Sequence, residues 1–377
     1  MIYLDYNATT PVLPEVLDGM LPYFTEDWGN PSSAYKFGYK VKSAIETARE
    51  QVANLIGAHP MEVIFTSCAT ESNNAAIHAA LKGSPGKRHI VTSAVEHSSV
   101  LNYCMALEKE GFRVTYLPVD REGLLNLADL GNAITGETAV VSLMWANNET
   151  GVLFPVKEIS ALCQARGVLY HCDAVQAAGK IDINLRNLSI NYLSLTGHKF
   201  NAPKGIGALY VKRKTPVSPF VHGGHQERNL RGGTESVPLI VGMGKAAEVT
   251  KKHLVDYDKN VRPLRDKLEN AILSSIPNTE LNGDKCYRLA NTTNITFHGI
   301  EAESLLILLD KEGFCASSGS ACLAESDEPS HVVKAMKPDS GASRHMIRFS
   351  LGYETSSQHI HDAVTVIRYT TDMLRSQ

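Results

Sequence analysis

Short apolar runs alternate with amphipathic stretches along the first part of the chain, and this pattern predicts its secondary structure. Apolar runs bounded by turn residues predict buried strands at 62–67, 89–95, 139–144, 168–172, 190–195 and 205–211. Apolar residues at helical spacing predict helices at about 71–81 and 98–110. Strands and helices that alternate in this way, from about residue 51 to residue 211, are typical of a mostly parallel sheet covered on both faces.

The pattern changes in the last third of the chain. It predicts a long helical region at about 238–259, a second helix at 262–275, strands at 292–297 and 346–351, and helices at 301–311 and 357–373. A chain of 377 residues is also long for a single hydrophobic core. We therefore expect a large α/β domain over residues 15–259 and a small α+β domain formed by residues 1–14 and 260–377.

The composition is that of an ordinary globular protein, with 43% hydrophobic residues, 20% charged residues and a net charge of −3. This charge argues against a nucleic-acid-binding surface, and no apolar stretch is long enough to cross a bilayer. The start of the chain lacks the basic flank and apolar run of a signal peptide. We expect a cytoplasmic protein that binds neither nucleic acid nor membrane directly.

The seven cysteines are scattered, and none forms a Cys-x-x-Cys pair, which argues against a disulfide framework or a zinc ribbon. Most are expected to be small buried residues, including Cys315, which follows Phe314 on an apolar run. Cys322 differs, because small and polar residues surround it on both sides. This composition is typical of a mobile exposed loop, which we expect from about 319 to 329. A thiol on such a loop suits a nucleophile that must travel.

The strongest candidate chemistry lies at the ends of two predicted strands. Asp173 follows the strand at 168–172, and Lys199 follows the strand at 190–195 after a hydroxyl, a glycine and a histidine. Open α/β sheets bind ligands past the carboxyl ends of their strands. A lysine that forms a Schiff base and an acid that pairs with a pyridinium nitrogen are what pyridoxal phosphate requires of a protein. Each residue alone is more simply a cap, but together they predict a pyridoxal phosphate site.

Three further segments allow two interpretations each. The turn at 66–71 leads from a strand into a helix and offers an anion site, or Thr70 is an ordinary helix cap. His97 at another strand end could stack on a cofactor ring or move a proton, or it is a partly buried histidine satisfied by its neighbours. Gly242 and Gly244 match part of a dinucleotide fingerprint. No strand precedes them, so we interpret them as sites of close helix packing.

The ordered motifs of this chain resemble those of the class I cysteine desulfurases over essentially the full length. This family consists of pyridoxal-phosphate enzymes of fold type I within aminotransferase class V. The motifs that carry the resemblance lie at 3–11, 29–33, 66–71, 96–97, 147–149, 171–176, 197–199, 231–234 and 317–322. The sequences at 144–151 and 223–228 are most similar to those of the nitrogen-fixation branch. The implied fold is an α/β fold with a mostly parallel sheet in a large domain and a smaller α+β domain.

The resemblance implies a role for each candidate residue. Lys199 would bind the cofactor covalently and later move the Cα proton, His97 would assist proton transfer, and the Cys322 thiolate would take up the substrate sulfur. Asn148 and Arg348 would bind the substrate carboxylate. The implied cofactor contacts are Ala69, Thr70, His97, Asn148, Asp173, Gln176, Thr196, His198, Lys199 and Thr234, of which Thr234 reaches the phosphate of the neighbouring subunit. The family usually has serine where Thr196 stands, and the hydroxyl is retained.

The implied activity is conversion of L-cysteine to L-alanine, with the sulfur kept as a persulfide for iron–sulfur cluster assembly. The implied partners are a second copy of the chain, in a homodimer, and an iron–sulfur scaffold protein that accepts the sulfur. Cys322 is the one metal candidate, as a transient iron ligand shared with that scaffold. Acidic residues follow it at Glu325, Asp327 and Glu328, where relatives often have fewer acids, so this loop could meet its partner differently.

Other functions on the same fold stay open at this point. A selenocysteine lyase, or a sulfur donor for tRNA thiolation, would use much of the same machinery. A transaminase needs no nucleophile on a loop, so Cys322 argues against it. A non-enzymatic sulfur carrier would not need Lys199, Asp173 and Arg348 together.

Overall fold

The computed structural model describes residues 1–319 and 329–376 of the chain. Its larger part is built on a seven-stranded sheet in the order β2-β8-β7-β6-β5-β3-β4, and a three-stranded sheet in the order β12-β10-β9 forms the smaller part. The strands are β1 Ile2–Tyr3, β2 Val63–Thr66, β3 His89–Ser93, β4 Arg113–Leu117, β5 Thr138–Ser142, β6 Leu169–Asp173, β7 Tyr192–Thr196, β8 Gly207–Val211, β9 Thr279–Asn282, β10 Thr292–Phe297, β11 Phe314–Cys315 and β12 Met346–Ser350.

The large sheet is parallel except for one strand. Strands β4, β3, β5, β6 and β7 pair in parallel, whereas β8 is antiparallel to both β7 and β2. The mostly parallel sheet that the sequence predicted is therefore confirmed. The direction of β8 was not predicted, because a short apolar run reads the same in either direction.

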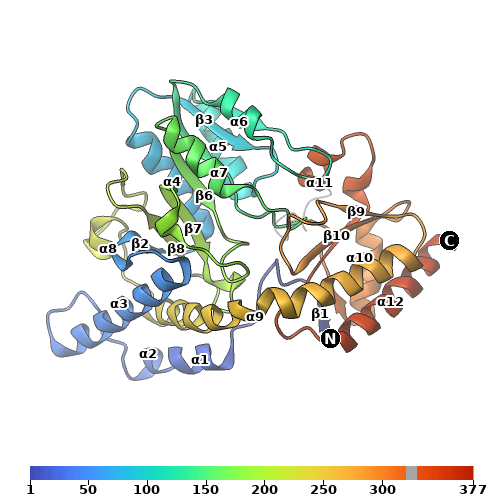
Figure 1. Ribbon diagram of the computed structural model, residues 1–377. Helices are drawn as coiled ribbons and strands as arrows, with labels where there is room; N and C mark the ends of the chain where they lie inside the picture. The colour runs from blue at the N-terminus through green and yellow to red at the C-terminus, as the bar shows by residue number, and fades with distance from the viewer. Residues whose placement is uncertain (320–328, 377) are drawn as a thin grey trace.

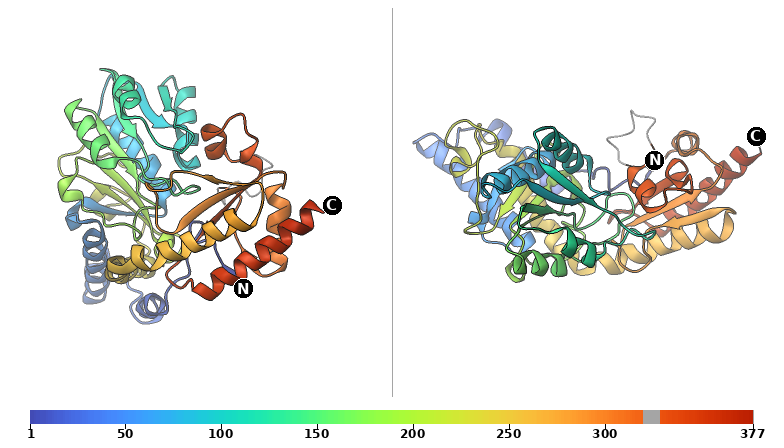
Figure 2. Two further views of the ribbon diagram at one scale, coloured as in Figure 1. Left: turned by 45° about the vertical axis from the view of Figure 1, so that its right-hand side comes forward. Right: turned by 90° about the horizontal axis from the view of Figure 1, so that it is seen from above.

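Helices cover both faces of the large sheet, as expected for this fold class (Figures 1 and 2). The helices are α1 Pro14–Met20, α2 Pro22–Thr25, α3 Lys36–Ile56, α4 Ala69–Lys82, α5 Ser98–Lys109, α6 Leu127–Ala133, α7 Val156–Ala165, α8 Gln226–Asn229, α9 Val237–Ser275, α10 Ala302–Lys311, α11 His331–Met336 and α12 Ser357–Arg375. Neighbouring strand residues such as Ile90 and Val91 belong to different apolar clusters. Ile90 packs with α4 and α5, and Val91 packs with α3, α7 and α9, because successive strand side chains point to opposite faces.

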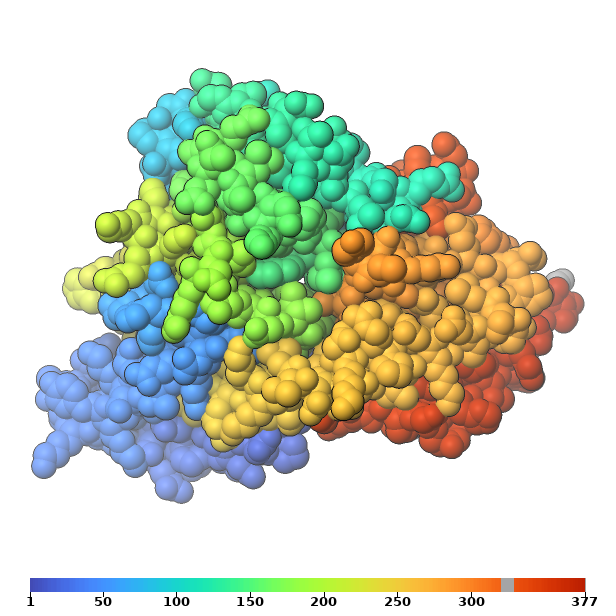
Figure 3. Space-filling model, in the orientation of Figure 1, coloured from blue at the N-terminus to red at the C-terminus, as the bar shows by residue number. Residues whose placement is uncertain are grey.

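Helix α9 joins the two parts of the molecule as one continuous helix of 39 residues (Figures 1 and 3). The break that the sequence predicted between residues 259 and 262 is therefore wrong. Pro263 lies on an exposed face of α9, so its ring disturbs no packing. Val261, Leu268 and Ile272 keep helical spacing across it and are buried in the smaller core, which compensates for the backbone hydrogen bond that proline removes.

The two glycines in the first half of α9 allow close packing, as predicted. A Cβ atom on Gly242 would lie 2.5 Å from Sδ of Met20 on α1, and one on Gly244 would lie 2.5 Å from Cα of Ala48 on α3. A larger residue at position 242 would have to displace the Met20 side chain, and one at position 244 would have to displace the backbone of α3. The partial dinucleotide fingerprint is thus a helix-packing feature.

The smaller part combines residues from both ends of the chain, and both termini lie on its side of the molecule (Figure 1). Its core contains Leu4 together with residues of α9, α10, β10, β12 and α12. Strand β1 pairs in parallel with β11, and the main chain of Asp5 bridges to Ser350 at the end of β12. This pairing brings the N-terminal segment beside the carboxyl ends of the large sheet. The domain boundaries at 14/15 and 259/260 remain a proposal. The different cores of Leu4 and Val16 support the first boundary, whereas Tyr257, before the second boundary, already belongs to the smaller core.

Candidate active site

A cavity lies where the carboxyl ends of β2, β5, β6 and β7 meet the N-terminal segment and β12; the empty space between its walls, with its open mouth included, is about 820 Å³. Open α/β sheets bind ligands at this edge. Ten of the twelve site residues proposed from the sequence line it: Ala69, Thr70, His97, Asn148, Asp173, Gln176, Thr196, His198, Lys199 and Arg348. The fold therefore gathers residues that are up to 279 positions apart, from Ala69 to Arg348 (348 − 69).

Asp173 is the last residue of β6, and its carboxylate is held by two donors. The amide of Val175 donates to Oδ1 at 2.9 Å, and the side chain of Asn73 on α4 donates to Oδ2 at 2.7 Å. The carboxylate is largely buried and faces the cavity. An acid fixed in this position suits a partner with a protonated ring nitrogen.

Lys199 ends the short turn Gly197–Lys199 that follows β7. Its Nζ donates to the backbone carbonyl of Asn7 at 2.6 Å and to that of Ala8 at 2.7 Å. The N-terminal segment thus holds the amine at the edge of the cavity. A lysine amine in this position can form a covalent imine with an aldehyde that occupies the cavity.

The start of α4 also faces the cavity. Cys68 is the N-cap residue, and no side chain caps the helix. The interpretation of Thr70 as the cap is therefore wrong, because Thr70 is the second residue of the helix. The first backbone amides of a helix without a side-chain cap favour an anion such as a phosphate.

His97 caps α5 from the other side of the cavity. Its Nδ1 accepts from the backbone amide of Ser99 at 3.1 Å, which places the proton of the neutral ring on Nε2. Burial lowers the pKa of His97, although the nearby Asp173 carboxylate opposes this shift. The neutral ring can therefore pack against a flat cofactor and accept or donate a proton at Nε2.

Thr196 and His198 flank the turn that carries Lys199. The Thr196 hydroxyl donates to the backbone carbonyl of Ile206 at 3.1 Å and keeps its lone pairs, and His198 Nδ1 lies 3.2 Å from the hydroxyl of Thr9. Burial, followed by the charge of Lys199, lowers the pKa of His198 to about 4. His198 is therefore neutral at neutral pH and acts as a hydrogen-bonding group rather than a cation.

Arg348 enters the cavity from β12, the strand of the smaller sheet. Its Nη2 pairs with Asp5 at 2.6 Å, and its Nη1 donates to the carbonyl of Asn148 at 3.0 Å. Its Nε has no hydrogen-bond partner among the residues that the structure describes. A buried guanidinium with an unused donor is suited to bind a carboxylate.

The remaining two predicted residues are not in this cavity. Thr234 lines a separate cavity with Ser67, Gly205 and Arg231, and Cys322 lies outside the described residues. The mobility predicted for 319–329 and the predicted distance between Cys322 and Lys199 fall on the same undescribed segment. Cys315 is half-buried rather than a core residue, because β11 is a short edge strand paired only with β1. Burial raises the pKa of its thiol, which disfavours the thiolate.

Several residues that support the site were not found from the sequence. Asn7, Asn73 and Lys180 each bond directly to a residue of the cavity. Asn73 lies one helical turn after Ala69, so the helix period could have placed it beside the helix start. Nothing in the local pattern pointed to Asn7 or Lys180, because their partners are distant in sequence.

The cavity fits pyridoxal phosphate on these observations. It brings together an amine, a fixed carboxylate and uncapped helix amides, which match the aldehyde, ring nitrogen and phosphate of that molecule. Within residues 1–319 and 329–376, no group of three or more histidine, cysteine or acidic side chains could hold a metal ion. No helix in the same part of the chain has the length and apolar character needed to cross a bilayer.

Comparisons with known proteins agree with this site. A family model described as aminotransferase class-V matches residues 2–362. Cysteine desulfurase 2 of Trichormus variabilis is 52% identical over 376 residues, which cover 100% of this chain and 94% of that protein. The cysteine desulfurase NifS of Azotobacter vinelandii is 47% identical with the same coverage. A solved structure of a NifS-like protein has a TM-score of 0.92, 34% identity and 100% coverage of both chains. The chain therefore belongs to the aminotransferase class-V family, in its group of pyridoxal-phosphate-dependent cysteine desulfurases.

Proposed function

We propose that the chain converts L-cysteine to L-alanine in the cavity at the carboxyl edge of the large sheet. The observation that carries this proposal is the convergence of the Lys199 amine, the Asp173 carboxylate and the uncapped start of α4 in one cavity that Arg348 closes from the smaller sheet. An amino acid substrate needs a cationic group that binds its carboxylate, as well as a cofactor. Arg348 is well placed for that purpose.

Each side chain then has a definite task. Bound pyridoxal phosphate supplies the electron sink that the carbon–sulfur bond cleavage requires. Lys199 would bind the cofactor and move the proton at the substrate Cα, and Asp173 would hold the proton on the ring nitrogen. The amides of Ala69 and Thr70, with Thr196 and His198, would hold the phosphate. Gln176 would donate to the ring oxygen.

The substrate side of the cavity has its own set of residues. Asn148 and the unused Nε of Arg348 would bind the substrate carboxylate. His97 would stack on the cofactor ring and accept or return a proton at Nε2. Its lowered pKa keeps the ring neutral at the start of the reaction.

The sulfur would leave on Cys322. The thiolate attacks the substrate sulfur, a sulfur–sulfur bond forms as the Cβ–sulfur bond breaks, and the substrate carbon takes a proton. The products are alanine and one protein persulfide, so atoms and electrons balance without an external oxidant or reductant. The relatives named NifS support a role in which this sulfur supplies iron–sulfur cluster assembly, including assembly for nitrogen fixation.

We also propose a homodimer. Thr234 and Arg231 line a cavity apart from the candidate active site, so Thr234 would serve the phosphate of a second copy rather than its own. An iron–sulfur scaffold protein would accept the sulfur from Cys322. During that transfer Cys322 would be a transient ligand for iron, which is the scaffold's cargo.

The direct test is anaerobic incubation of the purified protein with L-cysteine, with alanine and protein-bound sulfane sulfur measured together. We expect equal amounts of both before reductant is added. Cys322→Ser should still bind cysteine and change the cofactor absorbance, because Lys199 and Arg348 are unchanged. Both products should fall to background in this variant, since the serine oxygen cannot take up the sulfur.

The same assay separates the alternatives. Alanine release that survives in Cys322→Ser would indicate a lyase that does not need the loop thiol, and would overturn the proposed persulfide route. Parallel incubation with L-selenocysteine would then show whether that substrate is preferred. Cys315→Ser is the matched control, because its thiol lies outside the cavity and should leave both products unchanged.

A further inference from the structure

Lys180 is a buried lysine that no part of the proposed function uses. The residue is 6% exposed, and it lies four positions after Gln176 in the turns that follow β6. Its Nζ donates to Oε1 of Gln176 at 2.6 Å and to Oδ1 of Asn7 at 2.8 Å. Both acceptors belong to residues that line the candidate active site.

The surroundings of Lys180 are unusual for a buried lysine. The acceptors that it contacts are amide oxygens, whereas buried cations are normally paired with carboxylates. The nearby charged groups are Lys199, on the turn after β7, and Arg348, on β12, whose partner is Asp5. Burial and these two cations lower the pKa of Lys180 well below its ordinary value.

The hydrogen bonds of Lys180 determine which way the Gln176 amide faces. Because Lys180 donates, the Gln176 atom beside it must be the oxygen, and Nε2 then donates to the carbonyl of Asn7 at 3.0 Å. The second N–H of Nε2 is therefore the group that the Gln176 amide offers to the cavity, because its oxygen is turned toward Lys180. The same Asn7 carbonyl accepts from Lys199, so Gln176 and Lys199 share one support.

Asn7 is fixed in turn by its own side chain. Its Nδ2 donates to the hydroxyl of Thr292 and to the carbonyl of Asn148, and its Oδ1 accepts from Lys180 and from Asn291. The orientation of this amide is therefore determined on both sides. Removal of Lys180 would leave two amide oxygens in a buried site with fewer donors, which favours rotation of either amide.

We propose that Lys180 is a positioning residue of the cofactor site, which holds the Gln176 amide with its N–H toward the cofactor and holds the Asn7 carbonyl that supports Lys199. This inference rests on the proposed function, because it assumes that Gln176 donates to the ring oxygen of pyridoxal phosphate. This role explains why an amine is buried at a position where an apolar side chain would pack with a smaller desolvation penalty.

The sign of the effect on the bound cofactor follows from this arrangement. An N–H donated to the ring oxygen stabilises its ionised form, and any positive charge on Lys180 acts in the same direction. Both therefore favour loss of the proton from the imine nitrogen on Lys199. Removing Lys180 should therefore raise the pKa of this imine nitrogen, which is measured from the change in the absorbance of the bound cofactor with pH. His97, His198 and Asp173 also face this site and stay in place in the variant.

The test compares Lys180→Met with the wild-type holoenzyme by spectrophotometric titration. We expect the pKa of the absorbance change to rise by about half a unit or more. We also expect the dissociation constant for pyridoxal phosphate to increase roughly tenfold, as for a lost hydrogen bond to a charged group. Thermal unfolding of the apoprotein should change little, because methionine can fill the space of the lysine stem.

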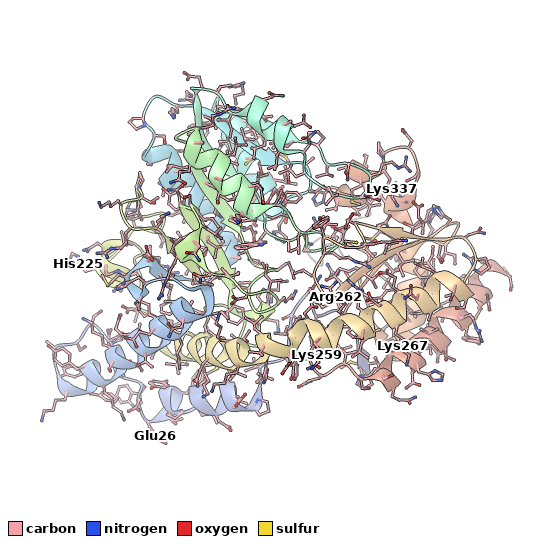
Figure 4. All side chains as sticks on the ribbon, in the orientation of Figure 1. Glu26, His225, Lys259, Arg262, Lys267 and Lys337 are labelled. Atoms are coloured by element: carbon pink, nitrogen blue, oxygen red, sulfur yellow. The ribbon has the colours of Figure 1, made fainter. Side chains whose placement is uncertain are left out.

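Lys337→Met is the matched control. Lys337 is 5% exposed and also donates to the main-chain oxygen of Leu281 and the side-chain oxygen of Asn282, but it is paired with the Glu280 carboxylate at 2.6 Å. It follows α11 in the smaller part of the molecule (Figure 4) and is not among the residues that line the cavity. In this variant, the pKa obtained from the absorbance titration should equal that of the wild type. In Gln176→Ala protein, a second substitution of Lys180 should move the pKa much less, because Lys180 acts partly through Gln176.

The outcomes are distinct. An unchanged absorbance titration in Lys180→Met, with cofactor bound and alanine formed by the wild type, would overturn this inference and leave the proposed function intact. A shift of equal size in the presence and absence of Gln176 would also overturn it. Failure of the wild type to bind pyridoxal phosphate or to form alanine would instead contradict the proposed function.

Discussion

At the scale of single residues, the site depends on buried groups whose neighbours decide their protonation. Glu96 precedes His97 and is fully buried, where it accepts from the backbone amide of Met144 and the hydroxyl of Ser93. Burial raises its pKa to about 8. Its backbone carbonyl accepts from His331, so this residue connects the support of His97 to α11. The folded protein therefore carries a neutral acid beneath the cavity at neutral pH.

This acid gives the protein a predictable pH dependence. Between about pH 4.5 and pH 8 the unfolded chain loses the Glu96 proton and the folded protein keeps it, so this residue makes the free energy of unfolding fall as the pH rises. Glu96→Gln should remove that fall. In chemical denaturation, the free energy of unfolding of the variant should exceed that of the wild type by at least about 1 kcal/mol near pH 8. The two values should be nearly equal near pH 5.

Glu269→Gln is the control of opposite sign. Burial raises the pKa of Glu269, but hydrogen bonds from Arg288 and Thr293 outweigh it and lower the pKa overall. The stability that this carboxylate contributes is present above its unfolded pKa, so Glu269→Gln should destabilise the protein most at neutral and higher pH. A difference between Glu96→Gln and the wild type that is the same at both pH values would contradict the account of Glu96.

Sequence reasoning found ten of the residues that line the cavity and missed several residues that hold them in place. Asp173 and Lys199 were predictable because each follows a buried strand, where the side-chain type alone indicates a ligand site. Asn7 lies 192 positions from Lys199, and Asn73 lies 100 positions from Asp173. An asparagine has many ordinary uses, so its role appears only when the fold brings its partner within bonding distance.

At the scale of elements, eight strands were predicted closely, whereas β1, β4, β9, β11 and several helices were not predicted. The strand predicted at 292–297 has the same bounds as β10, and the other predicted strands differ from the observed ones by a few residues at either end. Helix α3 was missed although it is 21 residues long and its buried residues Val41, Ile45, Ala48 and Val52 keep helical spacing; its start at Lys36 has no side-chain cap to mark it. The predicted break in α9 is wrong because the packing of both flanks holds the helix together.

The continuous α9 leads to a stability prediction. Pro263 leaves the carbonyl of Lys259 without its helical donor, and the position is exposed. Pro263→Ala should raise the free energy of unfolding by about 1 kcal/mol, after the greater freedom of the unfolded chain is subtracted. Lys259, four residues earlier on α9 (Figure 4), is also exposed; Lys259→Ala restores no hydrogen bond and should have a smaller effect. A loss of stability in Pro263→Ala would show that the proline is needed where it stands.

At the scale of the whole molecule, two cores enclose one cavity. The large sheet supplies the cofactor-facing residues, the smaller sheet supplies Arg348, and α9 contributes to both cores. The N-terminal segment crosses between them, because Leu4 belongs to the smaller core and Asn7 reaches Lys199. The sequence indicated two units, but it could not show that Asn7 and Ala8 would line the cavity. Their contacts depend on how the two cores dock.

The central claim is that this cavity binds pyridoxal phosphate on Lys199, and peptide mapping tests it most directly. Borohydride reduction of the yellow holoenzyme, followed by proteolysis and mass spectrometry, should find the pyridoxyl group on Lys199. Lys199→Ala should retain no reducible adduct, because Nζ of Lys199 is the amine that the N-terminal segment holds at the cavity. An adduct on Lys180, the other lysine beside Asn7, or on any lysine outside the cavity would contradict the account.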